Sequence, residues 1–301
     1  MKNKFSLLAA LAMLIAGTSL TQAQSYYISP VGDFPSLEGW AAAHGRPMTG
    51  FIDLVFDANM DSDASLEASI IPDFAAFTFL LDSSNNPLSI SPWAGTVTPF
   101  AFVDFSAASG GENFAFAVTN DSTVSLSGFS SIFDGGTANT GVFMLGNGLN
   151  GAGTFSATGA GAMSPAISTA GGVIIDGGVN TFSGFTAASG AAIYLPGIGG
   201  ASAGLTIHDG TVNVFQNNTA TGPGGAIYMD ASIAAAGGPG ITIAGNNTFI
   251  GNSSGGYGGG AIYMEGTPGD YRNKGVVVTG TFSFQNNTTT GVGGAIGLRN
   301  K

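Results

Sequence analysis

The chain has 301 residues, a net charge of −11 at pH 7 and no cysteine. The absence of cysteine excludes disulfides, thiol catalysis and cysteine-ligated zinc, and seven Lys and Arg residues are too few for clustered phosphate contacts with nucleic acid. Fifty glycines disfavour helices, while 44% hydrophobic and 8% charged residues disfavour disorder. The composition predicts short strands broken by turns.

Residues 1–23 have the pattern of a secretory signal peptide. Lys2 and Lys4 are followed by an apolar run over residues 5–16 and by the small-residue cleavage site Thr21-Gln22-Ala23. The apolar run is too short to span a bilayer. We therefore expect an exported protein, located at the cell outer membrane, on the cell surface or in the medium.

Residues 24–50 are expected to cap the N-terminal end of the fold. A strand ending at Pro30 precedes a short amphipathic helix that begins near Ser36 and ends at Gly45. Leu37 and Trp40 share its apolar face. This segment resembles the capping helix of parallel β-helix carbohydrate enzymes, which covers an otherwise open apolar end.

The acidic segment 57–67 is a weak candidate for a Ca²⁺ loop. Oxygen-bearing side chains alternate along it, at Asp57, Asn59, Asp61 and Asp63. Ser62 stands where such a loop needs glycine, and Glu67 falls one place early. A solvated acidic loop is the favoured interpretation, and we expect no cofactor and no other metal site.

Two short motifs recur in the C-terminal half of the chain. Phe-x-x-Asn occurs at Phe215, Phe249 and Phe284, which are 34 and then 35 positions apart. Gly-Gly-Ala-Ile follows each copy after 9, 10 and 9 positions. The motif residues are Phe215, Asn218, Gly224, Gly225, Ala226, Ile227, Phe249, Asn252, Gly259, Gly260, Ala261, Ile262, Phe284, Asn287, Gly293, Gly294, Ala295 and Ile296. A fixed period of this length predicts a repeat architecture.

Weaker copies extend the repeat back to about residue 124. The run from Val173 to Phe182 matches the run from Ile241 to Phe249, although Phe185 replaces the asparagine of the motif. Phe155 is expected to open a shorter unit. We predict an all-β, right-handed parallel β-helix over residues 51–301, irregular to about residue 122, with two or three short strands in each regular unit.

Each motif residue has a structural role in such a fold. Stacked asparagines can form a ladder in which each amide donates to the next coil and accepts from the previous one. Stacked phenylalanines pack offset above one another, and the glycine pair permits a tight corner with positive φ. We expect these motifs to determine the fold, and the loops between units, at 196–203, 230–240 and 265–274, to make external contacts.

The alternation of Gly-Gly-Ala-Ile with Phe-x-x-Asn resembles the repeats of the chlamydial polymorphic outer-membrane proteins. That resemblance implies an autotransporter with a β-helical adhesin passenger, a C-terminal membrane β-barrel and adhesion through the motif residues. After the last repeat the sequence ends at Lys301 without the alternating segments of a barrel. We therefore expect a truncated or fragmentary member, or a passenger exported by another route, whose last coil could self-associate.

Two other functions compete with an adhesin that binds a host-cell receptor or the extracellular matrix. One is a purely structural or self-assembling surface protein. The other is a polysaccharide-active β-helix enzyme, which needs a base together with an arginine or metal on adjacent coils. Asp176, Asp209 and Asp230 have no basic neighbour in sequence before Arg272, and His44 and His208 are isolated. We therefore expect no catalytic activity.

Overall fold

The structure is a computed structural model. It describes residues 123–136, 141–146, 153–196, 204–230, 240–266 and 276–300, and the earlier strands at 52–56, 66–67, 76–81, 88–90, 101–104 and 113–118. These parts of the chain contain strands and no helix. The expected signal peptide and capping helix lie outside the described residues.

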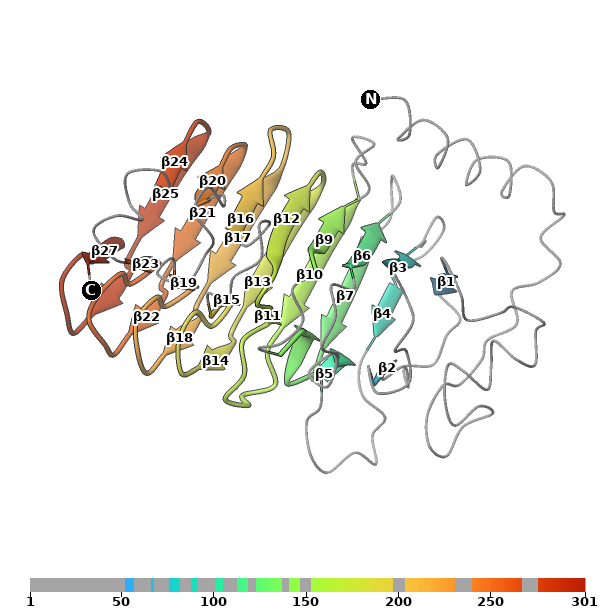
Figure 1. The fold of residues 1–301 in the computed structure, drawn as a ribbon, viewed down its shortest axis with the longest axis horizontal. Coiled ribbons are helices and arrows are strands. Elements are labelled where there is room, and N and C mark those ends of the chain that lie inside the picture. Colours follow the sequence, from blue (N-terminus) through green and yellow to red (C-terminus); the bar gives the residue numbers. More distant parts are fainter. Residues whose placement is uncertain are drawn as a thin grey trace, which may run out of the picture.

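The strands stack in four parallel sheets, and the coils follow one another along the long axis of the molecule (Figure 1). The first sheet contains β1 (Ile52–Phe56), β3 (Ala76–Leu81), β6 (Asn113–Val118), β9 (Phe143–Gly146), β12 (Gly172–Asp176), β16 (Gly204–Ile207), β20 (Ile241–Ile243) and β24 (Val276–Val278). The second contains β4 (Leu88–Ile90), β7 (Thr123–Ser127), β10 (Thr154–Thr158), β13 (Val179–Ser183), β17 (Val212–Gln216), β21 (Asn246–Ile250) and β25 (Thr281–Gln285).

The other two sheets complete each coil. The third contains β2 (Leu66–Glu67), β5 (Ala101–Asp104), β8 (Ser131–Asp134), β11 (Ile167–Ser168), β15 (Ile193–Leu195), β19 (Ile227–Asp230), β23 (Ile262–Gly266) and β27 (Ile296–Asn300). The fourth contains the two-residue strands β14 (Thr186–Ala187), β18 (Thr219–Ala220), β22 (Ser253–Ser254) and β26 (Thr288–Thr289). A regular coil therefore passes through the first, second, fourth and third sheets in turn.

The parallel β-helix predicted from the repeats is confirmed, with every strand paired in parallel to its counterpart one coil away. The weaker copies are also in register, because Val173 pairs with Leu205 and Phe182 pairs with Phe215. The short unit expected at Phe155 is present as β10, between β7 and β13. The right-handed sense of the coil stays a prediction.

The number of strands in a coil differs from the expectation of two or three, because the fourth sheet adds another. A two-residue strand such as β18 is too short to display alternation in the sequence. Its hydrogen bonds come from stacking on the neighbouring coil, as in the bond from the Ser253 amide to the Asn218 carbonyl. Stacking, and not local sequence, therefore makes this sheet.

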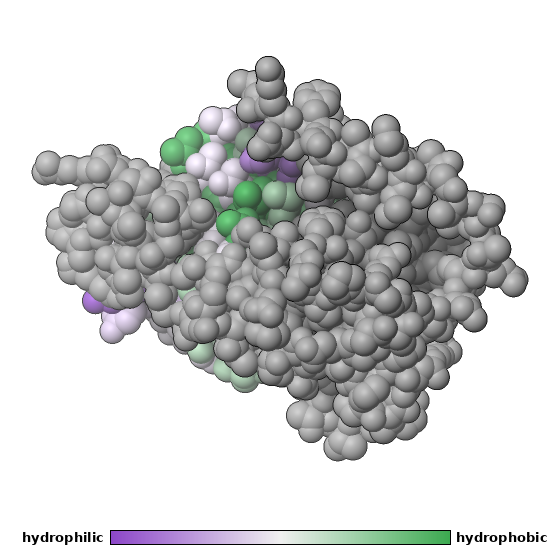
Figure 2. Space-filling model, turned by 45° about the vertical axis from the view of Figure 1, so that its right-hand side comes forward, coloured by the Kyte–Doolittle hydropathy of each residue, from purple (hydrophilic) through white to green (hydrophobic). Residues whose placement is uncertain are grey.

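The core runs along the inside of the coil. Strands of the second sheet alternate between buried and less buried positions, so that Phe182, Phe215 and Phe249 have no exposed surface. On the face drawn in Figure 2, hydrophobic and hydrophilic residues lie next to one another where described residues reach the surface. In the described part of the chain, no helix is long and apolar enough to cross a bilayer.

Candidate functional site

The asparagines of the three Phe-x-x-Asn motifs form one continuous column. Asn218 Nδ2 donates to Asn252 Oδ1 at 3.1 Å, and Asn252 Nδ2 donates to Asn287 Oδ1 at 2.9 Å. Each Nδ2 also donates to the phenylalanine carbonyl of the preceding coil, as Asn252 does to Phe215 at 2.9 Å. The predicted ladder is therefore present, and the first two asparagines are completely buried.

The phenylalanines of the motifs form a second column inside the coil. The ring of Phe215 lies 5.5 Å from that of Phe182 and 4.8 Å from that of Phe249, which in turn lies 5.1 Å from Phe284. The ring planes differ by 9° to 15°, so these are stacked pairs. The column adds aromatic contact to the burial of each ring.

The two glycines of each Gly-Gly-Ala-Ile motif are required for different physical reasons. The first glycine has positive φ, 72° at Gly224 and 65° at Gly259. The second is crowded, because a Cβ on Gly225 would overlap the carbonyl oxygen of Gly260 in the next coil. The alanine and isoleucine that follow are buried in the first two motifs. The corner therefore requires these residues for the fold.

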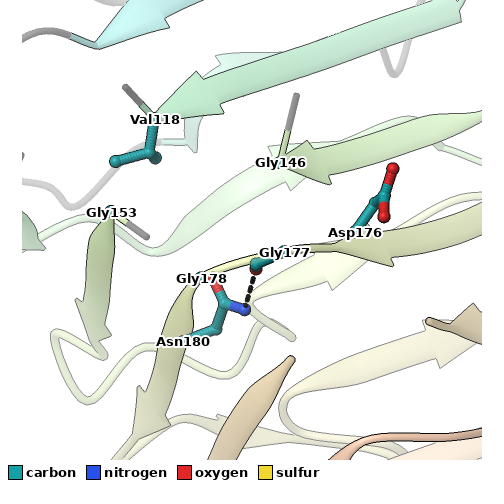
Figure 3. A pocket seen from close by; sticks show the side chains of 7 residues that line it. All are labelled: Val118, Gly146, Gly153, Asp176, Gly177, Gly178 and Asn180. Carbon is teal, nitrogen blue, oxygen red and sulfur yellow. Dashed lines mark hydrogen bonds between the residues drawn. The ribbon is translucent and has the colours of Figure 1, made fainter. Parts of the chain in front are cut away.

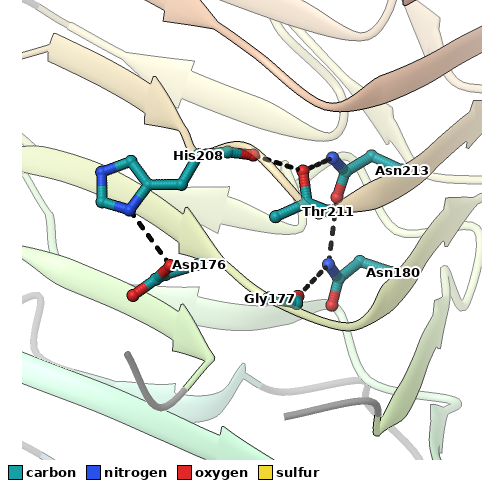
Figure 4. Close-up of polar contacts among 6 residues, drawn as sticks. All are labelled: Asp176, Gly177, Asn180, His208, Thr211 and Asn213. Carbon is teal, nitrogen blue, oxygen red and sulfur yellow. Dashed lines mark hydrogen bonds and ion pairs between the residues drawn. The ribbon is translucent and has the colours of Figure 1, made fainter. Parts of the chain in front are cut away.

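A second asparagine ladder was not predicted. Asn180 Nδ2 donates to Asn213 Oδ1 at 3.0 Å, and Asn213 Nδ2 donates to Asn247 Oδ1 at 3.0 Å. Figure 4 shows Asn180 and Asn213 of this ladder beside Thr211, whose hydroxyl accepts from Asn213 Nδ2 at 2.9 Å. The available signal was the Asn-x-Phe pattern that recurs at Asn180, Asn213 and Asn247.

A small cavity lies at the Asn180 end of the second ladder. It has a volume of about 10 Å³ and is lined by Val118, Gly146, Gly153, Asp176, Gly177, Gly178 and Asn180 (Figure 3). This volume is just sufficient for one water molecule. The cavity is too small for an organic substrate.

His208 forms a link between two coils at the surface. Its Nδ1 lies 3.1 Å from Asp176 Oδ1, with 48% of the histidine side chain exposed (Figure 4). The sequence left His208 isolated, and it did not reveal Asp176 as its neighbour on the adjacent coil. No group of three or more His, Cys, Asp or Glu residues suited to a metal occurs within the described residues.

The third sheet carries a column of tyrosines on its outer side. The Tyr228 ring lies 5.4 Å from Tyr194 and 6.0 Å from Tyr263, and its hydroxyl donates to Glu265 Oε2 at 3.1 Å. Burial raises the pKa of the Tyr228 phenol above its ordinary value, and the carboxylates of Asp230 and Glu265 raise it further. Tyr228 is therefore a neutral packing group, and both Tyr228 and Tyr263 are almost fully buried.

An open hollow lies at the end of this tyrosine column. It has a volume of about 680 Å³, and its lining includes Gly256, Tyr257, Tyr263, Val292 and Arg299. Tyr257 is 64% exposed, and the Arg299 guanidinium carbon lies 4.0 Å from the centre of its ring. A hydrogen bond with Tyr257 is the largest of the effects that raise the pKa of Arg299. The hollow thus combines an aromatic ring with a permanent positive charge.

The remaining predicted site residues are not described. Asp57, Asn59, Asp61 and Asp63, proposed as a weak Ca²⁺ loop, and His44 lie outside the described residues. Most of the three variable loops lies outside them too.

The motif residues, in contrast, are brought together in columns that face inward. In the first two copies Phe215, Asn218, Phe249 and Asn252 have no exposed surface. In the third copy Phe284 and Ile296 are partly buried and pack against the core. The motifs therefore build the coil, and the outer side of the coil is what a partner could reach.

Comparison with known proteins agrees with this picture of the motifs. The Chlamydia polymorphic membrane protein repeat matches residues 214–230 and 281–298. Each matched segment begins in or at a strand of the second sheet and ends in the third sheet, so it contains one Phe-x-x-Asn and one Gly-Gly-Ala-Ile motif. No curated protein and no solved structure matches the chain. The chain therefore carries, on a parallel β-helix, the repeat of the Chlamydia polymorphic membrane proteins.

Proposed function

We propose that the chain is an exported, surface-exposed passenger that acts as an adhesin and binds host-cell or matrix surfaces. The repeat at residues 214–230 and 281–298 is that of a membrane-protein family, and its stacked coils fit a passenger displayed at the cell surface. The signal peptide expected at residues 1–23 would give the route across the first membrane. Outer-membrane association is part of the proposal.

The observation that carries the proposal is the division between a constant interior and a variable exterior. Asn218 and Asn252 are buried and satisfied by other residues of the coil, so they are unavailable to a partner while the coil is intact. The segments between units, at 196–203, 230–240 and 265–274, differ in length and composition. A rigid scaffold with variable connections is typical of binding proteins.

The test is binding of the purified chain to cultured epithelial cells and to immobilised matrix proteins. We expect saturable binding that falls at least tenfold when residues 197–203, 231–239 and 267–274, which leave out the strand residues of the three variable segments, are replaced by Gly-Ser segments of the same length. Far-ultraviolet circular dichroism and the urea midpoint check that the replaced chain keeps its fold. A matched control replaces only residues 160–162, at a turn in another coil, and should leave binding unchanged.

Two results would contradict the proposal in different ways. Equal binding by the chain with replaced segments, or no binding at all, favours the purely structural or self-assembling protein, which sedimentation would reveal as large oligomers. Cleavage of an acidic polysaccharide favours the β-helix enzyme. We propose no catalytic role, and the chain incubated with pectate or hyaluronan should release no new reducing ends.

A further inference from the structure

A one-residue insertion creates an exposed aromatic site on the outside of one coil. Six residues join Ser254 to Ala261, whereas five join Ala220 to Ala226 in the preceding coil and five join Thr289 to Ala295 in the following one. The flanking strands keep their register on both sides of the insertion. The turn therefore accommodates the extra residue, and its backbone still bonds to the next coil, where the Val292 amide donates to the Tyr257 carbonyl at 3.2 Å.

The inserted segment has room for only one side chain. A Cβ on Gly255 would lie 2.5 Å from the Thr221 carbonyl oxygen, and a Cβ on Gly256 would lie 2.8 Å from the Gly222 carbonyl carbon. A Cβ on Gly258 would overlap the Val292 carbonyl oxygen. Tyr257 is the exception, and its side chain is 64% exposed. An exposed tyrosine in a run that otherwise requires glycine needs a reason other than packing.

The surroundings of Tyr257 have the properties of a small-molecule site. The hollow of about 680 Å³ lies within the size range of ligand pockets. Gly255, Gly256 and Gly291 line it, and residues without side chains allow a ligand to approach the backbone closely. Thr290 also lines it, and its hydroxyl donates to the Gly255 carbonyl at 2.7 Å, so that toward a ligand it acts as an acceptor. A ligand ring with one apolar face and polar groups at its edge would fit this lining of glycines, an aromatic ring and a threonine.

Arg299 gives the hollow a preference for negative charge. Its guanidinium lies over the Tyr257 ring at 4.0 Å, which fixes its position, and 42% of its side chain is exposed. A planar guanidinium binds a carboxylate through two parallel hydrogen bonds. Glu265 forms an ion pair with Arg299, with 3.8 Å between Glu265 Oε1 and Arg299 Nη1, and only 11% of the glutamate side chain is exposed. A guanidinium has five N–H donors, so its exposed side can bind a ligand carboxylate in addition to Glu265.

From this geometry we propose that the hollow between Tyr257 and Arg299 binds a carbohydrate residue that carries a carboxylate. The apolar face of the sugar ring packs on the hollow beside Tyr257, and its carboxylate accepts hydrogen bonds from Arg299. The inference deepens the adhesin proposal, since it names the class of surface ligand. It concerns residues that the motifs do not include.

The test measures direct saccharide binding by the full chain, using titration calorimetry and saturation-transfer NMR. The probes are 3′-sialyllactose, a hyaluronan tetrasaccharide and neutral lactose, so that sialic and uronic acids are distinguished. We expect at least one acidic probe to bind with at least tenfold higher affinity than lactose. Tyr257→Ala should weaken that binding at least tenfold, and Arg299→Gln should remove the preference for the acidic probe.

Met163→Ala is the matched control, because Met163 is 58% exposed and lies outside the hollow. It should bind as the unaltered chain does, and the urea midpoints of all three variants show whether the fold is kept. The inference is overturned if no saccharide binds, or if Tyr257→Ala and Arg299→Gln bind as well as the unaltered chain.

Cell binding separates this inference from the wider proposal. Suppose that the unaltered chain, Tyr257→Ala and Arg299→Gln bind cells equally well, and that treating the cells with sialidase or hyaluronidase changes none of this binding. The adhesin proposal then stands and the saccharide site fails. If acidic saccharides bind at the hollow but cells do not, the site stands and the adhesin proposal fails.

Discussion

Asn218 donates its side-chain amide to Asn252, whose own amide donates in the same direction to Asn287, so each asparagine completes the hydrogen bonding of its neighbours in adjacent coils. Asn252 Oδ1 also accepts from the Asn218 backbone amide at 3.1 Å. One side chain thus satisfies backbone and side-chain groups of the preceding coil and a side-chain oxygen of the following coil.

Removal of the central asparagine should be strongly destabilising. Asn252→Ala leaves the Phe215 carbonyl and the Asn218 backbone amide without their partner, and buried groups in that state are costly. Asn287 Oδ1 loses one of the two hydrogen bonds that it accepts, and keeps the one from the Asn252 backbone amide. We expect a loss of about 2–4 kcal/mol in the free energy of unfolding, measured by urea denaturation.

Asn246→Ala provides the control for this substitution, because Asn246 is exposed at the start of β21. It should change the free energy of unfolding by less than about 0.5 kcal/mol. Equal effects of the two substitutions would show that the ladder contributes nothing beyond ordinary strand residues.

The phenylalanine column should weaken towards the last coil. Phe215→Ala opens a cavity between two stacked rings in a site with no exposed surface, and should cost about 3–5 kcal/mol. Phe284→Ala makes the same chemical change where the ring is only partly buried, and should cost clearly less. Urea midpoints of the two variants test the difference, and a larger loss at Phe284 would contradict it.

The second glycine of the Gly-Gly-Ala-Ile motif can be compared between two copies, at Gly225 and at Gly294. A Cβ on Gly225 would overlap the Gly260 carbonyl oxygen, while a Cβ on Gly294 would meet nothing within 4 Å. Gly225→Ala should therefore prevent close stacking and lower the melting temperature by many degrees, whereas Gly294→Ala should change it little. Similar melting temperatures for the two variants, measured by circular dichroism, would refute this account of the corner.

Tyr228 should make the fold sensitive to alkaline pH. Burial and the Asp230 and Glu265 carboxylates raise the pKa of its phenol in the folded state above its ordinary value of 10.0. The neutral phenol therefore contributes stability that is complete below pH 10 and is lost progressively as the pH rises above that value. The Tyr228 phenol should stay protonated until the coil unfolds.

The measurement is phenolate absorbance during an alkaline titration, compared between the unaltered chain and Tyr228→Phe. Glu265→Gln removes the charge beside Tyr228 and should move its ionisation to lower pH. A Tyr228 signal that titrates near pH 10 in the folded chain would contradict the predicted direction.

The sequence was sufficient to predict the columns that begin at Phe215 and Asn218, because their spacing repeats and each residue type has one plausible role in a stacked coil. It was misleading for Asn213. In the stretch Val212-Asn213-Val214-Phe215, the valines suggest one inward face and the phenylalanine suggests the other. The structure buries Asn213 and Phe215, and leaves Val212 37% exposed.

The hollow beside Tyr257 could be predicted only in part. The gap of ten positions between Phe249 and Gly259, against nine in the other two copies, locates the irregular coil. The position of Arg299 over the Tyr257 ring depends on the register between β23 and β27, which pairs Glu265 with Arg299. Forty-two positions of chain separate the two side chains, and no local pattern connects them.

The burial of the motif residues in the first two copies means that the most recognisable part of the sequence there is out of reach of any binding partner. Two chains with the same Phe-x-x-Asn and Gly-Gly-Ala-Ile pattern can therefore have unrelated outer surfaces. Similarity in these motifs shows a shared scaffold and says nothing of what the two chains bind. The binding partners of such a protein are decided by exposed residues that depart from the repeat pattern, and Tyr257 is one of them.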